Sequence, residues 1–394
     1  MSCPIVDPAS IDHARLRDER QARLQASMRD HGVEVCLLFN EPNIRYATGV
    51  STMPLWALTT MVRCALVPAE GTPILFEHPN SVHRARRLAK DVRPMGSWEF
   101  ADQADELADG WAGEMAAAMR ELGVAGTTIA LDRLGTPGFL ALGRLGYTFV
   151  DSAPTTEAAR EVKTPEEVRL FRANGPLLVD MLTAFEAAIE PGVRERDLLA
   201  VLADRMHRGG GEFQATSTIA SGPNTNPWRA EATDRALEAG DLVFVDTDTV
   251  GIGGAFFCVS RTFPVGAEPS ATQRALYRDA FGWLEQMQAV VEPGLTCAEI
   301  AARAPELPEK YRAQRYEVMI HSVGLEEESP SVCYPFDRQW NADRVIREDM
   351  VLVVELYAGE VGARDGVKLG DVVLVTAGGL EVLAPYPYSH ALLA

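Results

Sequence analysis

The chain changes character near residue 160, and this change limits the folds open to it more than any other feature. Before that point, short apolar runs of strand length alternate with helical patterns; after it, long helices are followed by strands and turns. Alternating strands and helices are typical of an α/β domain, whereas separate runs of each are typical of an α+β domain. A chain of 394 residues is long enough for two domains. We therefore predict an α/β domain over residues 1–155 and an α+β domain over residues 160–394.

Apolar residues with helical or strand spacing predict the elements of the first domain. Residues 12–31 and 102–122 have the periodicity of amphipathic helices. Short apolar runs predict strands at residues 35–39, 61–67, 73–76 and 128–131.

The second domain should begin with a long helix. Thr164 can cap it, Pro165 fits its first position, and Glu166 and Glu167 favour its positive end. The helix should end before Pro191. Further helices are predicted at residues 195–208 and 272–291, and strands at 242–245, 350–356 and 372–376.

Charge and composition exclude several classes of partner. The net charge of −19 repels nucleic acids and anionic lipid, and it favours a small or cationic ligand. No apolar run approaches the ~20 residues that a membrane span needs, and the first residues do not resemble a signal peptide. The six cysteines are scattered without a CxxC pair, which indicates reduced thiols in the cytoplasm.

Two acidic residues directly after a predicted strand form the densest polar cluster. Asp246 and Asp248 follow the apolar run 242–245. On an extended chain, side chains two residues apart point to the same face, and carboxylates that close need a cation or a shared proton. A solvated loop is the alternative interpretation. Active residues often lie where core strands end, so we interpret the pair as a candidate site.

His321 and Glu355 are polar residues in apolar surroundings. His321 is followed by a glycine turn and three glutamates, and Glu355 interrupts the apolar run 350–356. A glutamate buried in a strand needs a partner, which would be an arginine or a metal. Cys258 by itself predicts an inert buried thiol, with metal ligation as the alternative. Together, aspartate, histidine and glutamate form a donor set suited to iron, manganese or zinc.

Motifs in a characteristic order along nearly the whole chain resemble the pita-bread family of creatinase, aminopeptidase P and prolidase. They are Pro42-Asn43-Ile44-Arg45-Tyr46-Ala47-Thr48-Gly49, Lys163-Thr164-Pro165-Glu166-Glu167, Ser221-Gly222-Pro223-Asn224, Ser260-Arg261-Thr262-Phe263, His321-Ser322-Val323-Gly324-Leu325 and Gly366-Val367-Lys368-Leu369. The resemblance implies an N-terminal α/β domain, a C-terminal α+β pita-bread domain with the active site on its curved sheet, and a homodimer.

Within this family, Asp246-Thr247-Asp248 and Asn226-Pro227-Trp228 resemble the branch that contains the iron-dependent dimethylsulfoniopropionate lyase. Cys258 and Gly370 stand where the family carries metal-ligating carboxylates. The resemblance therefore implies either one iron, zinc or manganese ion per chain or none. Its implied ligands are Asp246, Asp248, His321 and Glu355, with Cys258 or Asp371 as further ligands.

The same resemblance implies roles for residues around the site. Glu327 would be the catalytic base of a lyase, and Tyr316 a second catalytic residue. Independently of the resemblance, an acidic site would suit a small zwitterionic or cationic substrate, which Trp56, Trp228 and Glu328 would bind, the tryptophans through cation–π contacts. Packing in the core is the alternative role of the two tryptophans. We therefore expect a lyase-type elimination.

Three alternatives stay open. A metal-free hydrolase similar to creatinase or ectoine hydrolase would use Asp246 as nucleophile. An Xaa-Pro dipeptidase would need two bridged metals, which Cys258 and Gly370 disfavour. A binding protein without catalysis would have no reason to keep buried charges.

Overall fold

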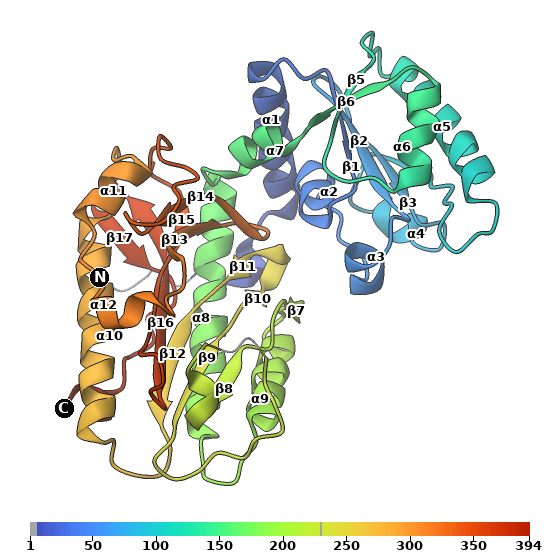
Figure 1. Cartoon of the computed structure of the whole chain (residues 1–394). Coiled ribbons are helices and arrows are strands. Elements are labelled where there is room, and N and C mark those ends of the chain that lie inside the picture. The colour runs from blue at the N-terminus through green and yellow to red at the C-terminus, as the bar shows by residue number, and fades with distance from the viewer. Residues whose placement is uncertain (1–5, 229–230) are drawn as a thin grey trace. The chain divides into compact units, whose positions relative to one another are not determined.

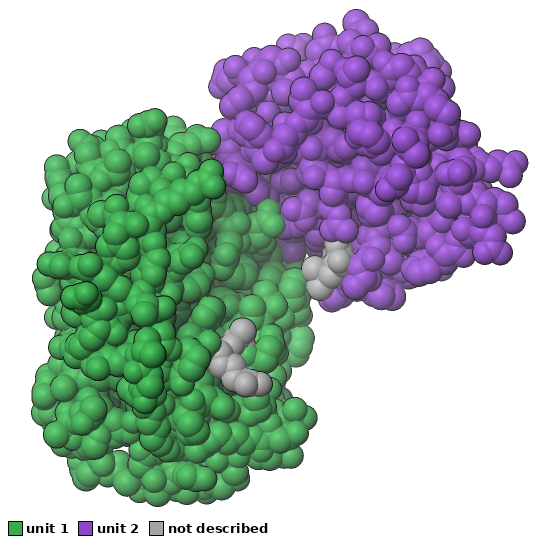
Figure 2. All heavy atoms as spheres, viewed as in Figure 1, with its two compact units in different colours: residues 1–11, 161–394 green, residues 12–160 purple. Residues whose placement is uncertain are grey.

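The computed structural model describes residues 6–228 and 231–394, so the predicted thiol at Cys3 lies outside the described residues (Figure 1). The chain divides into two compact units (Figure 2). Residues 12–160 form the N-terminal unit, and residues 161–394, with the segment before residue 12, form the C-terminal unit. The last helix of the N-terminal unit, α7 (Ala153–Arg160), spans the junction predicted between residues 155 and 160.

The N-terminal unit is built on a six-stranded sheet with the order β4-β3-β2-β1-β5-β6. β1 pairs antiparallel with β2 and parallel with β5, so the sheet is mixed. The strands are β1 (Val35–Leu38), β2 (Cys64–Pro68), β3 (Ile74–Glu77), β4 (Asp91–Pro94), β5 (Thr128–Leu131) and β6 (Thr148–Asp151). The helices before α7 are α1 (His13–Asp30), α2 (Glu41–Thr48), α3 (Pro54–Leu58), α4 (Val82–Ala85), α5 (Ala104–Glu121) and α6 (Thr136–Arg144).

The C-terminal unit contains a large sheet with the strand order β14-β13-β15-β16-β12-β9-β8, and β17 pairs with β16. A small second sheet has the order β11-β10-β7. The strands are β7 (Phe213–Gln214), β8 (Ile219–Ser221), β9 (Leu242–Asp246), β10 (Thr249–Val250), β11 (Phe256–Phe257), β12 (Ser260–Pro264), β13 (Val318–Val323), β14 (Glu327–Cys333), β15 (Val351–Gly359), β16 (Gly366–Thr376) and β17 (Gly379–Val382). The helices are α8 (Pro165–Ala187), α9 (Glu195–Arg208), α10 (Ala271–Val290), α11 (Cys297–Arg303), α12 (Glu309–Arg312) and α13 (His390–Leu393).

Local signals explain why α8 begins where it does. The Thr164 hydroxyl accepts a hydrogen bond from the Glu167 amide, and the Glu167 carboxylate accepts one from the Thr164 amide. This reciprocal capping box satisfies two amides that would otherwise lack partners. The start of the long helix predicted from Thr164 and Pro165 is confirmed.

The core of the C-terminal unit lies between α10 and one face of β15 and β16. Side chains of a strand point alternately to its two faces. Leu352, Val354 and Leu356 of β15 pack in this core, and so do Val367 and Leu369 of β16. The residues between them, Glu355 and Lys368 among them, therefore face the other side of the sheet.

No helix in the described part of the chain is long and apolar enough to cross a membrane. The five described cysteines are free thiols, and all are buried.

Candidate active site

The predicted polar residues lie on neighbouring strands of the large sheet, which bring them together. Asp246 ends β9, His321 lies in β13 and Glu355 lies in β15. The register places Ser260 of β12 opposite both Asp246 and Gly370, and it places Glu355 opposite Gly370. Residues far apart in the sequence thus meet on one face of the large sheet.

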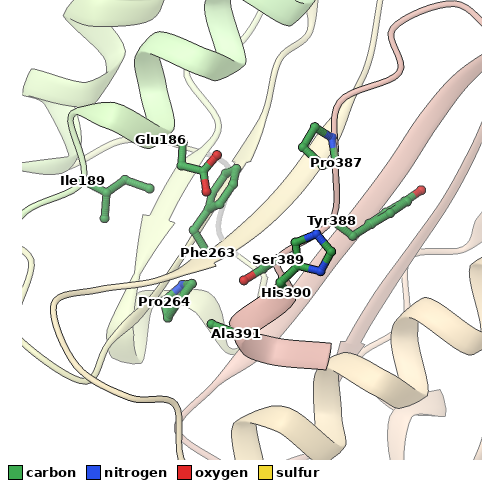
Figure 3. A pocket seen from close by; sticks show the side chains of 9 residues that line it. All are labelled: Glu186, Ile189, Phe263, Pro264, Pro387, Tyr388, Ser389, His390 and Ala391. Atoms are coloured by element: carbon green, nitrogen blue, oxygen red, sulfur yellow. The ribbon is translucent and has the colours of Figure 1, made fainter. Parts of the chain in front are cut away.

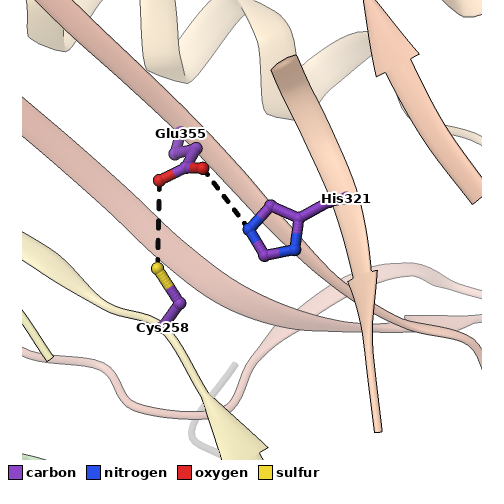
Figure 4. Close-up of side chains that lie close together, drawn as sticks. All are labelled: Cys258, His321 and Glu355. Carbon is purple, nitrogen blue, oxygen red and sulfur yellow. Dashed lines mark hydrogen bonds and ion pairs between the residues drawn. The ribbon is translucent and has the colours of Figure 1, made fainter. Parts of the chain in front are cut away.

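Cys258, His321 and Glu355 form the centre of the site, and all three are buried (Figure 4). His321 Nε2 lies 3.3 Å from Glu355 Oε1, and Cys258 Sγ lies 3.9 Å from Glu355 Oε2 (Figure 4). Cys258 Sγ also donates a hydrogen bond of 2.9 Å to Asp246 Oδ1. We call the five residues Asp246, Asp248, Cys258, His321 and Glu355 the donor cluster.

Asp248 joins the donor cluster by a different geometry from the one predicted. The backbone is not extended there, because Asp248 has a positive φ of 21°. Its carboxylate nevertheless has an oxygen within 4.8 Å of ligand atoms of Asp246 and Cys258. The Thr216 hydroxyl donates a 2.7 Å hydrogen bond to Asp248 Oδ2 and holds the side chain there.

Lys368 was not among the predicted site residues, yet its ammonium lies beside the donor cluster. It donates a hydrogen bond to Glu355 Oε2 and lies 3.6 Å from Asp246 Oδ2. Its side chain is 1% exposed, as is that of Glu355. The sequence signal was a lysine within the apolar strand 366–376, two residues before Gly370. The partner required by Glu355 is therefore this lysine together with His321.

Electrostatics couple Glu355 to its two cationic neighbours. Burial by itself would raise the pKa of Glu355, but the Lys368 ammonium and His321 lower it from 4.5 to about 2. Burial would lower the pKa of Lys368, but Glu355 and then Asp246 raise it above its ordinary value. Burial also opposes the charged form of His321, whereas its contact with Glu355 raises its pKa above 6.5. The three groups therefore stabilise one another in their charged forms.

Asp248 and Cys258, the other two donors with a shifted pKa, ionise less easily than they would in water. Burial, followed by the charge of Asp246, raises the pKa of Asp248 to about 7. Burial, followed by Asp246 and Glu355, raises the pKa of the Cys258 thiol well above 9.0. Cys258 is thus a neutral thiol that donates its proton to Asp246, and it becomes a metal ligand only if a cation displaces that proton.

Two aromatic rings lie next to the donor cluster. Trp228 and Tyr316 pack edge to face with their centroids 5.3 Å apart. The Lys368 ammonium lies 4.2 Å from the centre of the Tyr316 ring and 5.5 Å from that of Trp228. Trp56, the other tryptophan predicted to bind substrate, belongs to the N-terminal unit and stacks on His78 there. Of the three aromatic residues predicted at the site, the C-terminal unit brings Trp228 and Tyr316 to the cluster.

The acidic residues after His321 have different environments. Glu327 is exposed at the start of β14. After burial and Glu355, its charge contributes to raising the pKa of Tyr316. Glu328 is buried, and its carboxylate pairs with Lys163 at 2.7 Å and accepts the Leu325 amide. Glu328, predicted to bind substrate, is instead engaged in this internal ion pair.

Asp371 does not join the donor cluster, because it follows Gly370 and faces the opposite side of β16. It pairs with Arg261 at 2.7 Å and accepts hydrogen bonds from Gln288 and Tyr388. Tyr388 also lines a pocket of about 460 Å³ to which no donor-cluster residue contributes (Figure 3). The expectation that Asp371 supplies a further ligand conflicts with this placement, because alternation along the strand turns its side chain away.

The donor cluster contains side chains that could hold a metal ion. It offers two overlapping ligand groups, namely Cys258 with His321 and Glu355, and Cys258 with Asp246 and Asp248. His321 Nε2 is buried and faces Glu355 Oε1 at 3.3 Å, so it would serve as a ligand only in its neutral form. Carboxylates, an imidazole and a thiol suit zinc, iron or manganese. Gly370, opposite Glu355, supplies no further side chain to bridge a second ion.

Comparisons with known proteins identify the family of each domain. The description "Metallopeptidase family M24" matches residues 169–377, and "Creatinase/Prolidase N-terminal domain" matches residues 20–162. A dimethylsulfoniopropionate lyase, DddP of Roseovarius nubinhibens, is 31% identical over 97% of this chain and 88% of its own. An Xaa-Pro dipeptidase of Pyrococcus furiosus is 30% identical over 57% of this chain and 63% of its own.

Solved structures show the same fold. An Xaa-Pro dipeptidase from Bacillus anthracis has a TM-score of 0.77 at 21% identity, covering 95% of this chain and 99% of its own. An X-Pro aminopeptidase from Thermotoga maritima has a TM-score of 0.77 at 20% identity, covering 94% of this chain and 98% of its own. The predicted fold class, an α/β N-terminal domain with an α+β pita-bread domain, is confirmed.

Proposed function

The chain belongs to metallopeptidase family M24, and on this premise we propose that it is a one-metal lyase. Its reaction would be an elimination from a small zwitterion that carries a carboxylate and an onium group, such as dimethylsulfoniopropionate. We further propose that it acts in the cytoplasm.

The observation that carries the proposal is the composition of the donor cluster. It gathers buried and partly buried donors, and Gly370, which lies opposite Glu355, has no side chain that could bridge a second ion. Two-metal peptidases use a pair of metal ions, held together by bridging carboxylates, to generate the attacking hydroxide. This cluster lacks such a bridging carboxylate. Two dimethylsulfoniopropionate lyases that are 31% and 30% identical to this chain match 97% of its length.

The residues have distinct roles in this reaction. The donor cluster would hold the metal, which supplies a Lewis acid that polarises the substrate carboxylate. The Trp228 ring would offer its face to an onium group, since the Lys368 ammonium already lies 4.2 Å from the centre of the Tyr316 ring. Glu327, which is exposed at the start of β14, would remove the proton from the carbon beside the carboxylate. The electron pair of that C–H bond then forms the double bond, and the onium group leaves as a neutral molecule with the electrons of its bond to carbon.

The experiment is turnover of dimethylsulfoniopropionate and of related sulfonium and ammonium zwitterions by the purified protein. Acrylate and dimethyl sulfide would be measured together, because elimination yields them in equal amounts. Glu327→Gln should lower kcat by about 100-fold or more, the usual contribution of a general base. Glu326→Gln, a neighbouring acid, is the matched control and should retain most of the activity. The proposal would be contradicted if the protein eliminated none of the compounds tested, or if Glu327→Gln kept full activity.

A metal-free hydrolase is the second candidate, and the Lys368 ammonium favours it. This cation already hydrogen-bonds Glu355 and lies 3.6 Å from Asp246. Asp246 would then act as nucleophile toward a cyclic amidine or guanidino compound. Hydrolysis of such compounds by protein that elemental analysis finds free of metal would establish this candidate over the lyase.

A further inference from the structure

Lys368 places a permanent cation where a metal ion would have to bind. Its ammonium hydrogen-bonds Glu355 and lies 3.6 Å from Asp246, so it contacts two members of the donor cluster. We propose that Lys368 is an internal competitor of the metal, which stabilises the metal-free site and sets its affinity for the ion. The inference rests on the one-metal site of the proposed function and not on the reaction.

Burial makes this cation necessary when no metal is bound. Glu355 is 1% exposed and Asp246 is 5% exposed, so water screens neither carboxylate well. Two carboxylates buried side by side repel each other unless a cation lies between or beside them. The ammonium of Lys368 is that cation in the metal-free site.

The same contact must weaken metal binding. A divalent ion at the donor cluster would lie close to a buried ammonium that cannot be screened by solvent. The ammonium donates to Glu355 Oε2, the oxygen on the Cys258 side, so an ion held between Cys258 and Glu355 would compete with it for that oxygen. Metal binding therefore requires the ammonium to move away from the two carboxylates. The free energy of this displacement lowers the affinity of the site for the metal.

The aromatic pair gives the displaced ammonium a favourable surface. The Tyr316 ring already lies 4.2 Å from it, and the Trp228 ring 5.5 Å. A cation over an aromatic face keeps part of its stabilisation without using a carboxylate oxygen. The flexible four-carbon side chain of Lys368 is long enough for the ammonium to move from the carboxylates to the rings.

The test is calorimetric titration of the metal-free protein with zinc ion alone, together with thermal unfolding. Lys368→Met should bind zinc at least tenfold more tightly than wild type, and its metal-free form should melt at a lower temperature. Lys368→Arg keeps the charge and should keep weak zinc binding. Lys163→Met removes the other lysine of a buried pair, that with Glu328, and serves as matched control. It should lose stability without gaining affinity for zinc.

A second variant keeps the test decisive if Lys368→Met does not fold. Tyr316→Leu removes the ring nearest the ammonium, so zinc binding should weaken severalfold while Lys368 is intact. Unchanged or weaker affinity in a folded Lys368→Met, an equal gain in Lys163→Met, or unchanged affinity in Tyr316→Leu would overturn the inference. Wild type that takes up no zinc would overturn both the inference and the metal site. Wild type that binds zinc without catalysing elimination would contradict only the proposed reaction.

Discussion

Replacing Glu355 by glutamine tests whether the donor cluster holds a metal. The substitution keeps the size of the side chain but removes its charge. Glu355 contacts His321, Cys258 and Lys368, so its loss affects three neighbours at once. The variant should lose metal and activity by tenfold or more while its fold survives.

The cost to stability follows from the pKa of Glu355. Its cationic neighbours lower that pKa from 4.5 to about 2. At ~1.4 kcal/mol per pKa unit, this corresponds to about 3 kcal/mol of stabilisation of the charged form. Removing one partner of a buried pair costs a similar amount. For a unit of this size, the melting temperature should fall by roughly 10 °C.

The pH dependence gives an independent check. Since the pKa of Glu355 is lower in the folded state than its ordinary 4.5, its contribution is fully present above about pH 4.5. It is lost as the pH falls toward about 2. Glu355→Gln should therefore lack this part of the acid dependence of the unfolding free energy.

Asp371→Asn is the matched control. Asp371 is also buried on a strand of the large sheet and paired, but with Arg261 on the opposite face. We expect the control to lose stability and to keep its metal, whereas Glu355→Gln loses both. Denaturant unfolding and elemental analysis of the two variants measure these effects. A Glu355→Gln variant with wild-type metal content and turnover would refute the argument, and Glu355 would then be only structural.

Three further predictions follow from the site and the family. Because burial and Asp246 raise the pKa of Asp248 to about 7, protons should compete with the metal below that pH. Titrations should then show weaker binding at pH 6 than at pH 8, and Asp248→Asn should reduce the difference. Elemental analysis should find at most one metal per chain, and Xaa-Pro dipeptides should release no proline with added manganese or cobalt; two metals or rapid proline release would restore a peptidase. Light scattering should give a homodimer of twice the 42.9 kDa chain, and a mass near that of one chain would contradict the prediction.

Local chemistry explains why much of the fold could be predicted from the sequence. Several predicted elements depend on residues that are close together in the chain. Examples are the cap at Thr164, the helix pattern of residues 12–31 and the apolar run before Asp246. Their structures therefore match the expectation, with α1 (His13–Asp30) as an example. The predicted strand 372–376 is instead the end of the longer β16, because Lys368 and Gly370 hid the apolar pattern of its first half.

The sequence by itself determined that Asp246, His321 and Glu355 are polar residues in apolar strands that require partners. Only the tertiary structure decided which partners they have. The register between β15 and β16 places Gly370 opposite Glu355 and brings Lys368 to its carboxylate. The same alternation turns Asp371 to Arg261, and the pairing of β13 with β14 leaves Glu327 exposed while Glu328 reaches Lys163. A shift of one residue in such a register exchanges the two faces of a strand, so contacts between distant strands depend on pairing that no local pattern encodes.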